Sequence, residues 1–219
     1  MKVNKFIFSP FQENTYILWN EATKEAIIID PGCLSKKEEI ELINFITYNK
    51  LKVKYLFNTH GHLDHIFGNA FVKSNFNPVH YASEKDMPLF EKAQEQSASF
   101  GLAMKLSPTP DFYFDETKNI KFANIKIELI FTPGHTPGEF CIYFPTENIC
   151  FTGDVLFKES IGRTDLWGGN YETLLHSINS KLLVLPNYTT IYPGHGEKST
   201  IKNEKINNPF LTHLSKTKQ

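Results

Sequence analysis

The sequence lacks the features that mark several large classes of protein. None of its apolar runs approaches the roughly 20 residues that a membrane-spanning helix needs. Its formal net charge of −1 gives no basic surface for nucleic acid or for an anionic membrane. Residues 1–6 lack the long apolar segment of a secretory signal peptide. We therefore expect a cytoplasmic protein that binds neither nucleic acid nor a membrane.

Cysteine is scarce, and its pattern indicates neither a disulfide framework nor a metal site. Cys33, Cys141 and Cys150 are odd in number and do not fall at metal-ligand spacing. A reduced, cytoplasmic setting is the simplest interpretation. The chain has 219 residues, 41% of them hydrophobic, and no long linkers, repeats or low-complexity tracts. A chain of this kind can bury one large core, so we expect a single domain over residues 1–219.

Metal-capable side chains, by contrast, are concentrated in one short stretch, Thr-His-Gly-His-Leu-Asp-His at residues 59–65. Three imidazoles and one carboxylate suit Zn²⁺, Fe or Mn rather than thiophilic metals. These candidate ligands are His60, His62, Asp64 and His65. An apolar run before them predicts a buried strand at 54–57, and helical spacing after them predicts a helix that starts near Asp64. A strand-to-helix loop can present several ligands to one point.

Three further candidate ligands each follow an apolar run that predicts a strand. Residues 127–132 lead into His135, residues 148–152 into Asp154, and residues 189–192 into His195. Glycine or proline flanks each ligand, which fixes a tight turn and lets the backbone approach the site closely. The repeated order of strand, turn and ligand completes a set of seven candidate metal ligands.

These motifs, His-x-His-x-Asp-His followed by Gly-His, Gly-Asp and Gly-His, resemble the metallo-β-lactamase fold superfamily. The resemblance runs from about Phe6 to Leu211 and includes Ile-Asp-Pro-Gly at 29–32 and Ser-Ile-Gly-Arg-Thr-Asp at 160–165. Within the superfamily the chain looks most like the short, single-domain form of the glyoxalase II (hydroxyacylglutathione hydrolase) branch. The resemblance implies a four-layer αββα sandwich with the metal site at one sheet edge. Periodicity alone supports a mixed α/β fold.

The resemblance also implies two divalent metal ions, with Zn preferred and Fe or Mn as alternatives. The first ion would have three imidazole ligands, from His60, His62 and His135. The second would be held by Asp64, His65 and His195, with Asp154 bridging both ions. Shells of this composition leave open positions for water, as catalytic sites do. A hydroxide shared between the ions could attack an acyl carbon, with Asp64 orienting or deprotonating the water.

The activity that the resemblance implies is hydrolysis of a thioester, such as an S-2-hydroxyacylglutathione. The main alternative is a mononuclear iron dioxygenase acting on glutathione persulfide, with His60, His135 and Asp154 as its two-histidine-one-carboxylate centre. Those proteins commonly show Tyr-Pro-Ala-His-Asp at the last histidine, whereas residues 192–196 here read Tyr-Pro-Gly-His-Gly, which favours the hydrolase. Another hydrolase, such as a lactonase, and a non-catalytic binding module are further alternatives. The absence of an export signal argues against a β-lactamase.

The chain departs from full-length glyoxalase II at its C-terminal end. Those enzymes carry a helical extension whose basic residues grip glutathione, but this chain ends soon after residues 208–211. Ile206 is also apolar where short relatives often carry arginine. We therefore expect a small-molecule thioester as the substrate of a monomer or homodimer, without a predicted preference for glutathione.

Elsewhere the pattern predicts alternating strands and helices. Expected strands cover residues 6–8, 15–19, 25–29, 78–81, 120–122, 125–131, 140–144, 149–151 and 190–192. Expected helices cover residues 36–48, 83–97 and 171–185, with a short one from residue 200. Ser35 and Glu38 form a capping-box pattern, and the expected apolar face of that helix carries Ile40, Ile43 and Ile46. Pro88 fits the second helix only near its start or at a kink.

Several residues near the motifs keep two interpretations. Asp30 could hold a ligand imidazole by its outer nitrogen or could be a simple strand-to-turn aspartate. Arg163, the one arginine among 23 basic residues, could fix its loop through Asp165 or bind a substrate carboxylate. Residues 98–114, a long expected loop, could contact substrate or a second subunit, or only plug the core. The remaining histidines are expected to be structural or surface residues: His80, His176 and His213.

Overall fold

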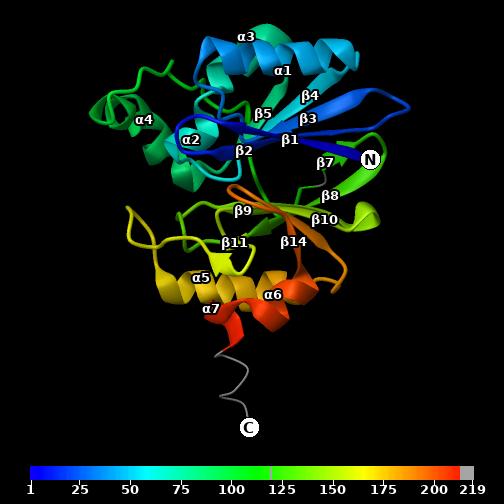
Figure 1. Cartoon of the computed structure of the whole chain (residues 1–219), viewed down its shortest axis with the longest axis vertical. Helices are drawn as coiled ribbons and strands as arrows, with labels where there is room; N and C mark the ends of the chain where they lie inside the picture. Colours follow the sequence, from blue (N-terminus) through cyan, green and yellow to red (C-terminus); the bar gives the residue numbers. More distant parts are fainter. Residues whose placement is uncertain (119, 213–219) are drawn as a thin grey trace. The chain divides into compact units, whose positions relative to one another are not determined.

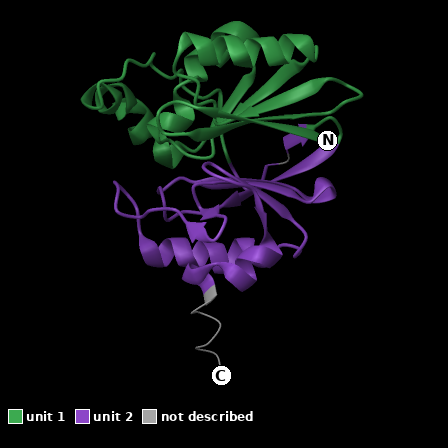
Figure 2. Ribbon diagram, in the orientation of Figure 1, with its two compact units in different colours: residues 1–114, 122–124 green, residues 115–121, 125–219 purple. Residues whose placement is uncertain are grey.

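The computed structural model describes residues 1–118 and 120–212, and His213 lies outside them. The chain divides into two compact units (Figure 2). Unit 1 comprises residues 1–114 and 122–124, and unit 2 comprises residues 115–121 and 125–219. Each unit combines a β-sheet with helices packed on it (Figure 1), which confirms the predicted α/β class. The expectation of one domain over the whole chain stays a prediction.

Unit 1 is built on a six-stranded sheet whose strands follow one another in chain order. They are β1 (Lys2–Phe8), β2 (Glu13–Trp19), β3 (Glu25–Ile29), β4 (Lys52–Phe57), β5 (Val79–Ala82) and β6 (Phe112–Tyr113). The first three strands pair antiparallel, whereas β3, β4, β5 and β6 pair parallel. Because β3 and β4 are parallel neighbours, the loops after Ile29 and Phe57 leave the sheet at the same edge.

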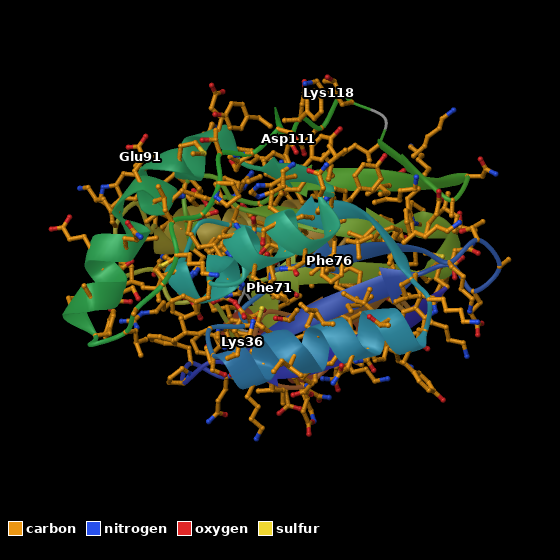
Figure 3. The ribbon with its side chains drawn as sticks, turned by 90° about the horizontal axis from the view of Figure 1, so that it is seen from above. Lys36, Phe71, Phe76, Glu91, Asp111 and Lys118 are labelled. Atoms are coloured by element: carbon orange, nitrogen blue, oxygen red, sulfur yellow. The ribbon has the colours of Figure 1, made fainter. Side chains whose placement is uncertain are left out.

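Helices connect the parallel strands of unit 1. They are α1 (Lys36–Tyr48), α2 (Leu63–Ile66), α3 (Asn69–Phe76), the 3₁₀ helix η1 (Glu84–Asp86) and α4 (Met87–Ser99). In Figure 1, α1 and α3 cover the same face of the sheet. Figure 3 shows Phe71 and Phe76 on α3, and their rings meet edge to face with centroids 6.3 Å apart. Pro88 lies in the first turn of α4, where a missing N–H costs no helical hydrogen bond, as expected.

Helix α1 begins where the capping pattern predicts it. The Ser35 hydroxyl accepts the Glu38 N–H at 3.3 Å, and the Glu38 carboxylate accepts the Ser35 N–H at 2.7 Å. The buried face of the helix is centred on Leu42 and Ile46, whereas Ile40 is 48% exposed. The prediction for Ile40 is wrong because the helix has more apolar residues than one face can carry, and Leu42 takes the place nearest the sheet.

The second six-stranded sheet, in the order β14-β13-β10-β9-β8-β7, belongs to unit 2 except for Phe122, the last residue of β7. Its strands are β7 (Ile120–Phe122), β8 (Ile125–Phe131), β9 (Phe140–Phe144), β10 (Ile149–Gly153), β13 (Thr190–Pro193) and β14 (Ser199–Thr200). A separate ribbon of β11 (Leu156–Phe157) and β12 (Ser160–Ile161) follows β10. Since β9 runs antiparallel to both β8 and β10, and β13 runs parallel to β10, the loops after β8, β10 and β13 leave at one edge.

Helices also pack on the sheet of unit 2 (Figure 1). They are α5 (Tyr171–Ser177), the π-helical segment η3 (Ile178–Leu182), α6 (Ile201–Asn207) and α7 (Pro209–Thr212). The Ser177 hydroxyl donates to the Pro133 carbonyl at 2.7 Å, and Lys181 donates to the Phe131 carbonyl at 2.6 Å. These bonds fix the chain that leaves β8. Among the described residues, no helix is long and apolar enough to cross a membrane.

Candidate metal centre

The seven predicted ligands fall into two groups, four in unit 1 and three in unit 2. In unit 1, His60 and His62 lie in the loop after β4, and Asp64 and His65 lie in α2. The ring centroid of His60 is 4.1 Å from that of His65 and 4.9 Å from that of His62. All three imidazoles are buried, and the Asp64 carboxylate lies 3.8 Å from His65 Nε2. This mixed nitrogen and oxygen donor set suits a divalent ion.

Asp30, the residue after β3, binds this group from outside. Its Oδ1 accepts the Thr59 N–H at 2.7 Å, and its Oδ2 accepts the Thr59 hydroxyl at 2.6 Å and the Nδ1–H of His65 at 3.1 Å. Because Nδ1 of His65 carries the proton, its Nε2 has the lone pair that a metal needs. The prediction that Asp30 holds an imidazole by its outer nitrogen is confirmed.

Asp86, at the end of η1, was missed by sequence reasoning. Its fully buried carboxylate accepts the Gly61 N–H at 3.0 Å, between the two histidines of the loop. A Cβ on Gly61 would lie 3.0 Å from both the Asp86 carbonyl oxygen and Leu89 Cβ. Glycine therefore allows the loop to pack tightly on the start of α4. No local pattern identifies Asp86, because 25 residues separate it from the glycine.

Glu13 in β2 is a second missed residue. Burial raises the pKa of its carboxyl well above the usual range, and the nearby charges of Asp30 and Asp64 add to this shift. The Thr15 hydroxyl donates to its Oε2 at 2.8 Å and accepts the Gly32 N–H at 2.8 Å. A Cβ on Gly32 would lie 2.0 Å from the same carboxylate oxygen. An acidic residue at the start of a largely apolar strand is the signal that could have identified it.

In unit 2 the three loops at one sheet edge carry the remaining ligands. His135 follows β8, Asp154 follows β10 and His195 follows β13. His135 and Asp154 are buried, and the His195 side chain is 29% exposed. The Asp154 Oδ2 lies 3.6 Å from His135 Nε2 and 3.5 Å from His195 Nε2. The structure therefore brings these three predicted ligands together.

The separations within this group are longer than hydrogen bonds. An N–H···O hydrogen bond spans about 2.7–3.2 Å, so 3.5 and 3.6 Å are too long for one. Two ligands bound about 2.1 Å from one tetrahedral ion are about 3.4 Å apart. The spacing of Asp154 from each imidazole matches this second geometry. The donor set of unit 2 therefore fits a divalent ion.

The loop of Arg163 fixes His135 through its backbone. The Nδ1–H of His135 donates to the Arg163 carbonyl at 2.7 Å, so its Nε2 carries the metal-binding lone pair. The guanidinium forms a bidentate pair with Asp165, with distances of 2.7 and 2.8 Å. This pair lowers the pKa of Asp165 to about 2. The predicted Arg163–Asp165 contact is confirmed.

Asp154 has two neighbours in unit 2 that the sequence did not indicate. Its N–H donates to the buried carboxylate of Glu139 at 2.7 Å. A Cβ on Gly162 would lie 1.8 Å from the Asp154 carbonyl oxygen, so only glycine permits this approach. Both contacts hold the backbone of the proposed shared ligand from sites distant in sequence.

Among the described residues, the two remaining histidines and the three cysteines belong to neither ligand group. His80 is buried, and its Nε2 lies 2.7 Å from Asn58 Oδ1, while His176 is exposed. These positions agree with the structural and surface roles expected of them. All three cysteines have free thiols and are buried. Burial raises the pKa of the Cys33 thiol far above its usual range, which makes it a poor ligand.

Comparison with known proteins identifies the family of this chain. The sequence profile of the metallo-beta-lactamase superfamily matches residues 8–195. The chain is 41% identical to hydroxyacylglutathione hydrolase GloC of Haemophilus influenzae, over 98% of this chain and 100% of that protein. The chain belongs to the metallo-beta-lactamase superfamily.

Two solved structures share this fold. BLEG-1 B3 metallo-beta-lactamase is 35% identical, with a TM-score of 0.88 over 96% of this chain and 100% of that one. TTHA1623 in a di-iron-bound form is 31% identical, with a TM-score of 0.84 over 95% of this chain and 100% of that one. The predicted family and fold class are confirmed. The fold implies divalent metal ions, and the described residues include groups of histidine and aspartate side chains that could hold them.

Proposed function

We propose that this chain is a metal-dependent thioesterase of the glyoxalase II type, acting in the cytoplasm on small acyl thioesters. The observation that carries the proposal is that two ligand imidazoles are each held by a hydrogen bond from Nδ1, the ring nitrogen that would not bind metal. His65 donates Nδ1–H to Asp30 and His135 donates it to a backbone carbonyl, so both present Nε2. The similarity to hydroxyacylglutathione hydrolase GloC along its full length supports the thioester as substrate class.

The proposed ligand set contains all seven motif residues. One ion would bind the three imidazoles of His60, His62 and His135. The other would bind the Asp64 carboxylate and the imidazoles of His65 and His195. Asp154 would serve both ions. Zinc is the proposed metal because nitrogen-rich shells with few carboxylates favour it. Iron is the alternative, since a 31%-identical relative has been solved in a di-iron-bound form.

When bound, the metal ions would lower the pKa of water and polarise the thioester carbonyl. The residues of the chain have separate tasks. The Asp64 carboxylate, 3.8 Å from His65 Nε2, would orient the attacking water and accept its proton. Asp30 and the Arg163 carbonyl would keep two imidazoles in the tautomer that binds metal.

Thiol release from acyl thioesters tests this function. Zinc-loaded protein should release free thiol from S-lactoylglutathione and from esters of smaller thiols. Asp154→Asn should lower turnover by about 100-fold, the upper end of the loss that follows replacement of a partner of a ligand, because Asp154 is itself a proposed ligand. The control is Glu91→Gln, on the exposed surface of α4 (Figure 3), which should keep full activity.

A second activity has one specific observation in its favour, the 35% identity to a B3 metallo-beta-lactamase. A chromogenic cephalosporin should therefore be assayed beside the thioesters. We expect slower turnover of the β-lactam than of any acyl thioester. Turnover of the cephalosporin or of a lactone without thiol release from any thioester would overturn the proposal.

A further inference from the structure

A group of buried polar side chains in unit 1 lies behind the histidine motif. Asn58, Asn69 and His80 are fully buried and Ser107 is 9% exposed. They come from the end of β4, the start of α3, β5 and the loop after α4. Buried polar groups are retained where their hydrogen bonds are satisfied, so their partners indicate what they hold.

Two asparagine amides form a reciprocal pair at the centre of this group. Asn58 Nδ2 donates to Asn69 Oδ1 at 3.2 Å, and Asn69 Nδ2 donates to Asn58 Oδ1 at 2.9 Å. Asn69 Nδ2 also donates to the Ser107 hydroxyl at 2.8 Å. Both amides therefore use their donors and acceptors within the core, and each fixes the orientation of the other.

His80 fixes the orientation of the Asn58 amide further. Asn58 Oδ1 accepts from His80 Nε2 at 2.7 Å, which assigns the His80 proton to Nε2. The backbone N–H of His80 donates to Asp111, which also pairs with Lys73 (Figure 3 shows Asp111). If the Asn58 amide were rotated by half a turn, its Oδ1 would face Asn69 Oδ1, and two acceptors would lie against each other. The Asn58 Nδ2 therefore has one stable direction.

That direction is towards the metal-ligand helix. Asn58 Nδ2 donates to the His65 backbone carbonyl at 2.9 Å. Helix α2 is four residues long, too short to be stable alone, and the carbonyls in its last turn need outside partners. The Asn58 amide supplies such a partner to the residue whose ring Asp30 holds from the other side.

We propose that Asn58 and Asn69 are positioning residues that hold α2, and with it Asp64 and His65, in the geometry that binds metal. This inference rests on the proposed metal-ligand roles of those two residues. Through Ser107, the same amide pair fixes the loop between α4 and β6 to α2. The 98–114 loop thereby gains a role in the site that is neither substrate contact nor core packing.

Metal affinity of folded protein tests this proposal directly. Asn58→Asp keeps the size of the side chain but removes the donor to the His65 carbonyl. Asn75→Asp is the matched control: it makes the same change on α3, where the amide bonds to Phe71 and Ser74 of its own helix. Stepwise zinc affinities are measured by competition with a chromophoric chelator, and the melting temperature of the metal-free form is measured in parallel.

The proposal predicts that Asn58→Asp weakens one of the two zinc affinities by about 10-fold or more, while the other changes little. Asn75→Asp should leave both affinities unchanged. A lower melting temperature of metal-free Asn58→Asp protein with both affinities unchanged would mean that the pair is only structural. An equal loss at both ions would mean general loosening, and either result overturns the proposal.

Two further measurements keep the test decisive. Asn58→Ser removes the same donor without adding a charge, and it replaces Asn58→Asp if that variant does not fold. Asn69→Ser should lower the affinity for the same ion by less, because this variant keeps the hydrogen bond from Asn58 to the His65 carbonyl. If the unsubstituted protein binds fewer than two ions, the proposed function fails. If the unsubstituted protein binds two ions and the Asn58 variants bind them with the same affinities, only the positioning role fails.

Discussion

The Nδ1–H of His135 donates to the backbone carbonyl of Arg163 at 2.7 Å, while the guanidinium of Arg163 binds Asp165 instead. The group that holds the proposed ligand is therefore the peptide of Arg163 and not its charge. Both side chains of this ion pair are exposed to solvent, 61% for Arg163 and 68% for Asp165. Its contribution is to fix the loop in which that carbonyl lies.

Arg163→Lys should lower the melting temperature slightly while leaving metal content and the pH profile nearly intact. Lysine keeps the charge but cannot form the bidentate pair, and exposed ion pairs contribute little to stability. Calorimetry and metal analysis of the two proteins check this. A rise in KM confined to acidic substrates, with an unchanged melting temperature, would show instead that Arg163 binds a substrate carboxylate.

Asp30→Asn should weaken metal binding by about 10- to 100-fold, the usual effect of losing the outer partner of a ligand histidine. Asparagine keeps the left-handed backbone at φ 48° but places an amide N–H against Thr59 or His65. Chelator competition measures the change. Glu91→Gln, a change of an exposed carboxylate on α4 of the same unit, is the control and should leave metal affinity unchanged.

His80 should make the metal-free protein less stable in mild acid. Burial lowers the pKa of its imidazole from 6.5 to about 4. Between these values the unfolded chain binds a proton that the folded protein excludes, so stability is lost as the pH falls from 6.5 to 4. The full loss is roughly 3 kcal/mol. Urea unfolding at pH 7 and pH 5 should show a smaller difference for His80→Gln than for the unsubstituted protein.

The preference between thiol leaving groups should be modest. Residue 206 is isoleucine where the resemblance to short glyoxalase II relatives would place an arginine, so we expect little binding energy from the distal part of glutathione. Values of kcat/KM for S-lactoylglutathione and for esters of smaller thiols measure this. A preference for glutathione beyond roughly a thousandfold, worth about 4 kcal/mol, would require another clamp within the chain.

Local patterns predicted much of this fold because their physical causes are local. The capping box of Ser35 and Glu38 fixes the start of α1, and Pro88 marks the first turn of α4. The order of strand, turn and ligand predicted the groups around His60 and Asp154, because loops after parallel strands meet at one edge. The capping box, the proline and each strand-turn-ligand motif depend on residues within a few positions of one another, whereas the pairing of distant strands brings the motifs together.

Except for Asp30, the residues that support the ligands from a distance were not predicted. Asp86 binds Gly61 across 25 positions, and Glu139 binds Asp154 across 15. Asn58 has no pattern of its own, since its role depends on Asn69 and on a short helix that the sequence does not delimit. The same limit explains Ile40: helical spacing identifies apolar residues, but the neighbouring sheet decides which face is buried.

Metal content measured together with thioester turnover tests the central claim most directly. Protein from its native host should carry close to two divalent ions per chain and hydrolyse acyl thioesters. Chelator should abolish turnover and zinc should restore it. Asp154→Ala should lower both metal content and turnover more than any other single ligand change, because the proposed site shares that carboxylate between both ions. One tightly held iron per chain, with oxygen consumption on a persulfide and no thioester hydrolysis, would contradict the account.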